Sequence, residues 1–267
     1  MLEVFYEDSD IIVVKKPVGM ESQSVHAFTP DLVSEIRKHI NRLSTTGGEP
    51  YVGVIHRLDK PVGGIMVYAK TKKAAAALSQ QVQNHQMKKE YMAVVCGKPV
   101  DNVGNFVDYL LKDGKNNVSK IVDKGITGAK RAELAYEVID TIVEKTERQE
   151  ESAEKEKYRR HDGEGNDNRR EESMQVLSLV RIRLLTGRHH QIRVQFAGHG
   201  LPLWGDKRYG GNQGADVRNA GARNAKTRSQ SVALSSCGLS FFHPTTKKLM
   251  EFHMEPEGAV FHKFLEP

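Results

Sequence analysis

The chain has 267 residues, of which 38% are hydrophobic and 28% are charged, proportions typical of a globular protein with a sizeable core. Lysine and arginine outnumber aspartate and glutamate by 40 to 34, and the resulting net charge of +6 suits a polyanionic partner without requiring one. No apolar run approaches the length of a membrane span, and the first residues do not form a signal sequence, so we expect a cytoplasmic protein with no membrane partner.

Two short apolar segments at the start of the chain predict a β-hairpin over residues 4–17. They flank the turn-forming sequence 7–10, and the second segment ends at Pro17 and Gly19.

Two segments further along predict helices. The first covers residues 31–43, with Thr29 as its N-cap, and the second follows the capping residue Thr71 over the alanine-rich residues 74–82. The apolar positions of the first helix recur every four residues and are Leu32, Ile36 and Ile40.

Residues 52–70, between these helices, predict a strand, a loop and a second strand. The two apolar β-branched runs are separated by a loop that contains Pro61 and a pair of glycines. This loop carries Arg57 and Asp59, and residues two apart in an extended segment point to the same face, so the two side chains can meet. From the spacing alone, the pair is as consistent with a surface ion pair of little energetic value as with a catalytic carboxylate.

Five further strands are expected. Residues 88–97 predict a strand that ends in a turn at Gly97, and Tyr91 within it has the spacing of an ordinary amphipathic strand residue. The other strand candidates are residues 109–111, 118–122, 132–143 and 174–185.

Residues 144–172 differ in composition from the rest of the chain. They carry charges of both signs and two glycines, and almost no aliphatic side chain larger than alanine. Such a segment buries too little apolar surface to offset the entropy of ordering it, so we expect a disordered insertion between two strands of a hairpin.

A helix is expected after the turn at Thr186, because Ile192 and Phe196 lie four residues apart, and it ends at Gly198 or Gly200. The histidines of this region do not predict a metal site, since adjacent histidines on a helix point about a quarter turn apart and no carboxylate lies at ligand spacing. They are His189, His190 and His199.

The C-terminal part of the chain combines a basic segment with a predicted hairpin. Residues 211–230 hold four basic side chains and one acid, which suits either phosphate binding or a solvated connection. Residues 232–244 and 248–254 predict the hairpin. Cys96 and Cys237 are too few for a disulfide framework, and we expect both to be buried in strands.

Four blocks of the sequence follow the order found in one enzyme family. They are His56-Arg57-Leu58-Asp59, Lys89-Glu90-Tyr91, Thr186 to Val194 and Pro202 to Gly210. Together they resemble the motifs of the RluA-type pseudouridine synthases over nearly the whole chain, apart from the insertion. Lys16-Pro17 also resembles the opening of that family's catalytic domain. We therefore expect a single catalytic domain over residues 1–267, without the small S4-type RNA-binding domain that some members carry upstream.

The resemblance implies an α+β fold: a long, mixed, mostly antiparallel sheet with flanking helices and a central catalytic cleft. It also implies that Asp59 is the catalytic carboxylate, that Tyr91 packs against the target base and that Arg193 pairs with Asp59. The residues expected to bind RNA are His56, Arg57, Arg188, His190 and Gln191. No cofactor and no metal are expected, and the implied protein is a monomer whose partner is rRNA or tRNA.

The implied reaction breaks the N1–C1′ bond of a uridine, turns the uracil and joins C5 to C1′. Asp59 can act on the ribose as a nucleophile at C1′ or as a base at C2′, and the sequence leaves both roles open. Arg193 is expected to keep this carboxylate ionised and oriented, because an opposite charge stabilises it. The target nucleotide is expected to flip out of the RNA, with Arg57 filling the gap that it leaves.

Two other functions compete with this interpretation. A retaining glycosidase needs a second carboxylate beside Asp59, and no block supplies one. A non-catalytic RNA-binding module explains the basic segments but leaves the Asp59 motif without a purpose. Three basic regions are candidates for phosphate contacts, although a solvated loop is the favoured interpretation of the first. They are residues 157–160, the pair Arg181 and Arg183, and residues 218–228.

Overall fold

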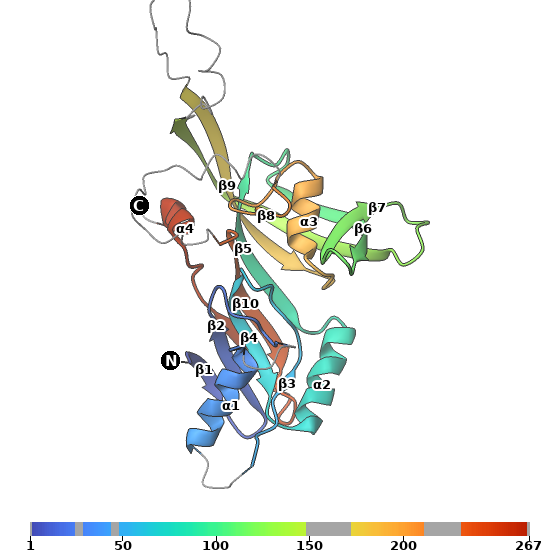
Figure 1. The fold of residues 1–267 in the computed structure, drawn as a ribbon, viewed down its shortest axis with the longest axis vertical. Helices are drawn as coiled ribbons and strands as arrows, with labels where there is room; N and C mark the ends of the chain where they lie inside the picture. Colours follow the sequence, from blue (N-terminus) through green and yellow to red (C-terminus); the bar gives the residue numbers. More distant parts are fainter. Residues whose placement is uncertain (1, 25–28, 44–47, 148–171, 211–230, 266–267) are drawn as a thin grey trace, which may run out of the picture.

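The computed structural model describes residues 2–24, 29–43, 48–147, 172–210 and 231–265. Within these ranges the chain forms one 11-stranded sheet flanked by helices (Figure 1). The helices are α1 (Leu32–Leu43), α2 (Lys72–Gln83), α3 (Gln191–Gly198) and α4 (Ala259–Leu265). None of these described helices has the length and apolar character needed to cross a membrane.

The strands form a single path through the molecule, in the order β1-β2-β4-β10-β5-β9-β8-β6-β7, with β11 added beside β10 and β3 beside β4. The pairing of β4 with β10 is parallel, and the other pairings between these strands are antiparallel. The strands are β1 (Val4–Glu7), β2 (Ile11–Lys16), β3 (Gly53–Val54), β4 (Gly63–Ala69), β5 (Lys88–Cys96), β6 (Val103–Asp113), β7 (Val118–Val122), β8 (Lys130–Glu147), β9 (Glu172–Leu184), β10 (Leu234–Phe242) and β11 (Leu249–His253). This arrangement confirms the predicted α+β class and the long, mostly antiparallel sheet.

The sheet is covered on both faces because successive strand residues point to opposite sides. On one face, Met66 of β4 belongs to the core cluster that also contains Ile36 of α1 and Phe196 of α3. On the other face, Ile65 of β4 packs with Leu78 of α2. Helix α4 covers a third cluster, built on β5 and β9. The β-branched and aromatic side chains of the strands are thereby removed from water on both sides.

Local sequence patterns predicted most of the helices and strands correctly. The N-terminal hairpin forms from β1 and β2, and the C-terminal hairpin forms from β10 and β11. Thr71 caps α2, since its side chain accepts a hydrogen bond of 3.1 Å from the Ala74 amide. The predicted cap of α1 was wrong: Asp31, rather than Thr29, accepts from the Ser34 amide at 2.7 Å. Both cysteines are buried and free, as expected.

The main differences from the prediction concern β6, α4, β8 and β9. Strand β6 covers Val103–Asp113 rather than residues 109–111 alone, and α4 was not predicted. Strands β8 and β9 extend through residues 144–147 and 172, which the composition had assigned to the insertion. The reason is that antiparallel pairing between the two strands continues to Glu147 and Glu172, and main-chain hydrogen bonds need no apolar side chain. The remainder of the predicted insertion, residues 148–171, lies outside the described residues.

Candidate active site

Asp59 lies in the loop between β3 and β4, and interior hydrogen bonds hold this loop. The Ser22 hydroxyl donates to the Leu58 carbonyl at 2.9 Å and accepts from the Leu58 amide at 3.0 Å. The Val62 amide donates to the Asp59 carbonyl at 2.9 Å and closes a turn that contains Pro61. Because the Leu58 side chain is buried in the core, the loop is anchored on one side and presents Asp59 on the other.

Lys16 joins this loop to the N-terminal part of the chain. Its side chain is fully buried at the end of β2, and its ammonium group donates to the carbonyls of Pro17 at 3.1 Å, Met20 at 2.5 Å and Lys60 at 3.3 Å. Burial lowers the pKa of Lys16 to about 8, and the nearby charge of Asp59 opposes that shift. Lys16 therefore links Lys60, the residue after Asp59, to the turn at Pro17 and Met20, which is distant in sequence.

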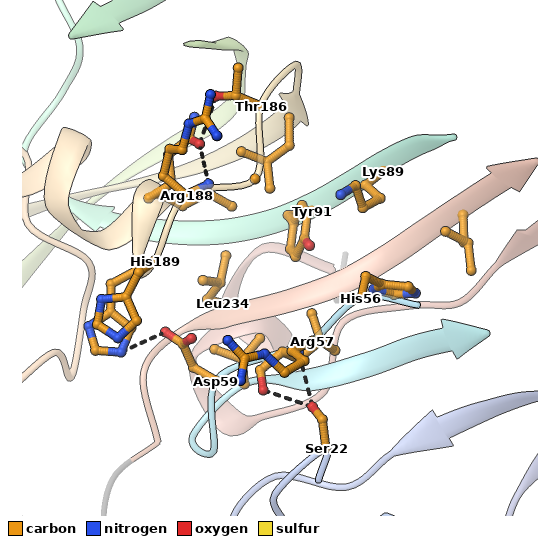
Figure 2. A pocket seen from close by; sticks show the side chains of 18 of the residues that line it. Ser22, His56, Arg57, Asp59, Lys89, Tyr91, Thr186, Arg188, His189 and Leu234 are labelled. Atoms are coloured by element: carbon orange, nitrogen blue, oxygen red, sulfur yellow. Dashed lines mark hydrogen bonds and ion pairs between the residues drawn. The ribbon is translucent and has the colours of Figure 1, made fainter. Parts of the chain in front are cut away.

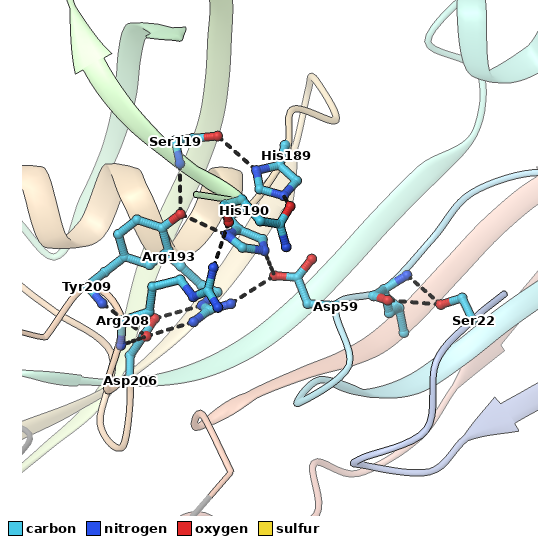
Figure 3. Close-up of polar contacts among 11 residues, drawn as sticks. Ser22, Asp59, Ser119, His189, His190, Arg193, Asp206, Arg208 and Tyr209 are labelled. Atoms are coloured by element: carbon cyan, nitrogen blue, oxygen red, sulfur yellow. Dashed lines mark hydrogen bonds and ion pairs between the residues drawn. The ribbon is translucent and has the colours of Figure 1, made fainter. Parts of the chain in front are cut away.

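Arg193, on α3, lies between two carboxylates. Its Nη1 donates to Asp59 Oδ2 at 3.2 Å, and its Nε and Nη2 donate to the two oxygens of Asp206 at 2.7 Å each (Figure 3). The side chain of Asp206 is 0% exposed, that of Arg193 is 6% exposed and that of Asp59 is 27% exposed. Burial alone would lower the pKa of Arg193, but the hydrogen bonds and charge of Asp206, with Asp59, raise it. The guanidinium is thus a fixed positive charge beside Asp59.

His190 approaches the same oxygen of Asp59 from the turn before α3. Its Nε2 lies 3.5 Å from Asp59 Oδ2, and its Nδ1 lies 2.7 Å from the hydroxyl of Tyr209. That hydroxyl accepts a hydrogen bond of 3.0 Å from the Ser119 amide. Burial lowers the pKa of His190 to about 4, although Asp59 opposes the shift, so the ring is neutral at pH 7.

The two oxygens of Asp59 differ in their surroundings. The contacts of Arg193 and His190 both end on Oδ2, as Figure 3 shows. Among the described residues no side chain donates to Oδ1. One oxygen is therefore held by the protein, and the other is available to a ligand.

Tyr91 lies on β5, near enough to Asp59 for the two side chains to interact electrostatically. It is 5% exposed and belongs to the same core cluster as Leu58 and Ile192. Burial raises the pKa of Tyr91, and the negative charge of Asp59 raises it further. The phenol is consequently protonated at neutral pH and offers a flat, largely apolar surface beside the carboxylate.

His56 and Arg57, which precede Asp59, have different environments. His56 Nε2 accepts from the Val67 amide at 3.4 Å, and burial, with the charge of Lys89, lowers the pKa of His56 to about 3. The ring is therefore neutral, and its proton is on Nδ1, which is buried without a partner in the described part of the chain. Arg57 is exposed and does not pair with Asp59, contrary to the possibility raised by their spacing. Asp59 pairs with α3 instead.

Gln191 was expected to contact RNA, but the structure commits its side chain to the interior. Its oxygen accepts from the Thr186 hydroxyl at 2.8 Å and from the Arg188 amide at 2.9 Å. Its nitrogen donates to the Glu133 carbonyl at 3.0 Å and to the Gln195 side chain at 2.9 Å. Gln191 is buried and shapes the turn before α3, whereas the side chain of Arg188 is exposed at the cleft.

An open cleft of about 2380 Å³ contains all the predicted site residues. Figure 2 shows three contributing elements: the loop with Asp59 and Arg57, strand β5 with Tyr91 and Lys89, and the turn with Arg188. Basic side chains outnumber acidic ones by ten to five among the described residues that line it. The basic residues are Arg57, Lys60, Lys88, Lys89, Lys112, Arg131, Arg183, Arg188, Arg193 and Arg208, and the acidic ones are Glu21, Asp59, Glu90, Glu133 and Glu251.

The other basic regions predicted to contact phosphates either form ion pairs or lie outside the described residues. Arg181 forms an ion pair of 2.9 Å with Glu137, and Arg183 forms one of 3.2 Å with Glu90, so the exposed side of β9 is not an unopposed basic surface. Residues 157–160 and 218–228 lie outside the described residues.

Sequence reasoning missed the roles of Asp206, Tyr209 and Ser119. The first two lie in the block from Pro202 to Gly210, so a signal for them existed, but nothing local indicates that they contact Arg193 and His190. Ser119 is on β7 and contacts Tyr209 through its backbone amide, so the residue type at this position gives no signal for that contact.

Comparison with known proteins identifies the family. A family model described as RNA pseudouridylate synthase matches residues 10–198. Ribosomal large subunit pseudouridine synthase D of Zymomonas mobilis subsp. mobilis is 30% identical over 259 residues, which cover 95% of this chain and 69% of the relative. The protein of the same name from Xylella fastidiosa is 32% identical over 252 residues, with coverages of 91% and 62%.

A solved structure agrees at the level of the fold. The structure of human RNA Pseudouridylate Synthase Domain Containing 4 matches with a TM-score of 0.66 at 18% identity, covering 97% of this chain and 90% of that chain. With the family model extending over most of the sheet, and with relatives of this similarity, the chain belongs to the RNA pseudouridylate synthases of the RluA type, which are isomerases acting on RNA.

Proposed function

We propose that the enzyme converts a specific uridine of rRNA or tRNA to pseudouridine, with Asp59 as the reacting carboxylate and the target nucleotide flipped into the cleft. The observation that carries this proposal is the asymmetry of Asp59. Its Oδ2 is held by Arg193 and faces His190, while its Oδ1 has no partner among the described residues and borders an open basic cleft. A carboxylate held in this way is oriented and has one oxygen accessible for reaction.

Both possible roles of Asp59 leave the atoms balanced. As a nucleophile, Oδ1 bonds to C1′ while the C1′–N1 bond breaks and uracil takes the electron pair. After the uracil turns, C5 attacks C1′, the Oδ1–C1′ bond breaks, C5 loses its proton and N1 gains one. As a base, Oδ1 removes the C2′ proton while the C1′–N1 bond breaks and uracil takes the electron pair. Oδ1 returns that proton to C2′ when C5 bonds to C1′, after which C5 loses its proton and N1 gains one, as in the first route. A substrate with deuterium at C2′ separates the two, because only the second route breaks the C2′–H bond.

The surroundings of Asp59 suit a flipped nucleotide. Tyr91 presents a buried ring next to the carboxylate, against which a freed uracil can pack. Arg57 is exposed beside it, without an ion pair in the described part of the chain, so its guanidinium is available to fill the gap in the RNA.

The RNA is proposed to bind mainly through its phosphates, because basic side chains dominate the cleft. The relatives named for the large ribosomal subunit favour rRNA over tRNA as the substrate. The monomeric state, the single-domain organisation, the absence of a cofactor or metal and the cytoplasmic location stay predictions from the sequence.

Carbodiimide modification followed by primer extension tests the proposal on RNA from a strain that lacks the gene. We expect one or more pseudouridine stops to disappear and to return with the wild-type gene. Asp59→Asn should not restore them, because it keeps the shape of the side chain and removes its charge. Asp101→Asn, an exposed residue outside the cleft, is the matched control. An unchanged pattern of stops in the deletion strain would contradict the proposal, and restoration by Asp59→Asn would contradict the role of Asp59.

A further inference from the structure

We propose that a hydrogen-bonded chain from Ser119 through Tyr209 to His190 aims the His190 ring at Asp59 and so fixes the orientation of the carboxylate toward the RNA. His190 is then a positioning residue rather than an RNA contact. This inference rests on the proposed role of Asp59. It concerns the three contacts drawn in Figure 3: 3.0 Å from Ser119 N to Tyr209 Oη, 2.7 Å from Tyr209 Oη to His190 Nδ1 and 3.5 Å from His190 Nε2 to Asp59 Oδ2.

The donor and the acceptor of each hydrogen bond in this series follow from the groups at its two ends. The Ser119 amide can only donate, so the Tyr209 oxygen accepts from it, and the phenolic hydrogen remains free for His190 Nδ1. A neutral ring that accepts at Nδ1 carries its hydrogen on Nε2, which faces Asp59. The opposite tautomer would direct the Nε2 lone pair at a carboxylate, which is repulsive. Tyr209 therefore selects the tautomer that stabilises Asp59.

The groups around His190 favour this neutral form. Asp59 faces the ring from the β3–β4 loop, Arg193 from α3 and Arg208 from the segment after α3. His189 stacks on it with a centroid distance of 3.7 Å. Asp59 alone favours a protonated ring, whereas burial and the neighbouring cations oppose protonation.

The backbone at His190 supports a specific placement of the ring. His190 is the N-cap of α3 and has left-handed dihedral angles, φ 53° and ψ 27°, without a capping hydrogen bond from its side chain. A residue with a Cβ in this region is strained by about 1–2 kcal/mol, which the contacts of the ring with Tyr209 and His189 help to offset. With this backbone conformation the imidazole lies against Asp59.

Arg193 and His190 therefore have different roles at Oδ2 of Asp59. Arg193 supplies the positive charge, and the Nε2–H of His190 points at the same oxygen from a second direction. Together the two contacts restrict rotation of the carboxylate about its Cβ–Cγ bond. The 3.5 Å separation is long for a hydrogen bond, and such contacts can shorten when substrate binds. Without the second contact, the carboxylate plane can rotate away from this orientation, and the reactive geometry is populated less often.

Tyr209→Phe is the sharpest test, since it removes the hydroxyl and keeps the ring that lies 5.1 Å from the Arg193 guanidinium carbon. We expect kcat on a uridine-containing RNA to fall by about tenfold to a hundredfold, with KM within about twofold of wild type, as for a misplaced catalytic group. His190→Gly, which relieves the backbone strain and removes the ring, should lower kcat by a similar factor. Tyr136→Phe removes the hydroxyl of a tyrosine outside the cleft and should leave kcat unchanged.

The double variant separates positioning from a general structural role. If Tyr209 acts through His190, then adding Tyr209→Phe to His190→Gly should lower kcat no further, whereas independent effects multiply. Thermal melting of each variant shows that the comparison is made between folded proteins. Unchanged kcat in folded Tyr209→Phe, or losses that multiply in the double variant, would overturn the inference. Neither result touches the proposed function, which fails only if the wild-type enzyme forms no pseudouridine or Asp59→Asn remains active.

Discussion

The pairing of Arg193 with Asp206 makes a prediction about stability as well as catalysis. Asp206 is completely buried and receives two hydrogen bonds of 2.7 Å from the guanidinium. Arg193→Met leaves that carboxylate buried and unpaired, and removing one partner of a buried ion pair costs about 3–5 kcal/mol. For a chain of this size the melting temperature should fall by about 6–20 °C.

A second substitution separates the two roles of the arginine. In Arg193→Met/Asp206→Asn the buried charge is absent, and the Asn oxygen can still accept from the Arg208 and Tyr209 amides, which contact Asp206 at 3.0 and 3.2 Å. Most of the lost stability should return, because no uncompensated charge remains. Activity should not return, because Asp59 still lacks its cation.

Thermal denaturation followed by circular dichroism measures the first effect, and single-turnover formation of pseudouridine measures the second. The reasoning is refuted if Arg193→Met melts within about 1 °C of wild type, well below the range expected for a buried unpaired charge. It is equally refuted if the double variant melts lower than the single one. Recovery of activity in the double variant would show that Arg193 serves Asp206 and not Asp59.

Three further predictions concern the loop, the cleft and the response to acid. Ser22→Ala should lower the free energy of unfolding in urea by about 1–3 kcal/mol, because the Leu58 amide and carbonyl lose their shared partner, and an unchanged midpoint would contradict this. The pKa of His56 is about 3 in the folded protein, against 6.5 normally, so only the unfolded chain binds this proton between those values. Stability should therefore fall as pH decreases through that window, by at most about 1.4 kcal/mol per pH unit, and His56→Gln should reduce the loss measured between pH 6.5 and 5. An equal loss in both proteins would show that His56 does not contribute. Lys89 lines the cleft, so Lys89→Met should weaken RNA binding and reduce the slope of log K against log salt by about 0.7–0.9. The exposed Lys73→Met on α2 is the control, and an unchanged slope for Lys89→Met would remove Lys89 from the phosphate contacts.

Local patterns were sufficient for much of the fold. The alternation of strand residues, the spacing of apolar residues in α1 and the cap at Thr71 depend on neighbours within a few positions, so the sequence displays them directly. The motif around Asp59 could also be read in this way, as could its likeness to a known family. Predictions were wrong where a partner outside the segment decided the outcome, as at the ends of β8 and β9, whose pairing with each other outweighs their polar composition.

The tertiary structure decided the contacts that make the site. Arg193 and Asp59 are 134 residues apart, and Arg57, two positions from Asp59, is not its partner. Gln191 belongs to the same motif as Arg193, yet it faces inward and holds a turn. Such outcomes depend on which side chains the sheet brings together and on how far each is removed from water, because a buried polar group must find a partner while an exposed one need not. The sequence by itself determined which residue types are present and which elements carry them. Only the packed sheet determined that one oxygen of Asp59 is held while the other has no side-chain partner among the described residues.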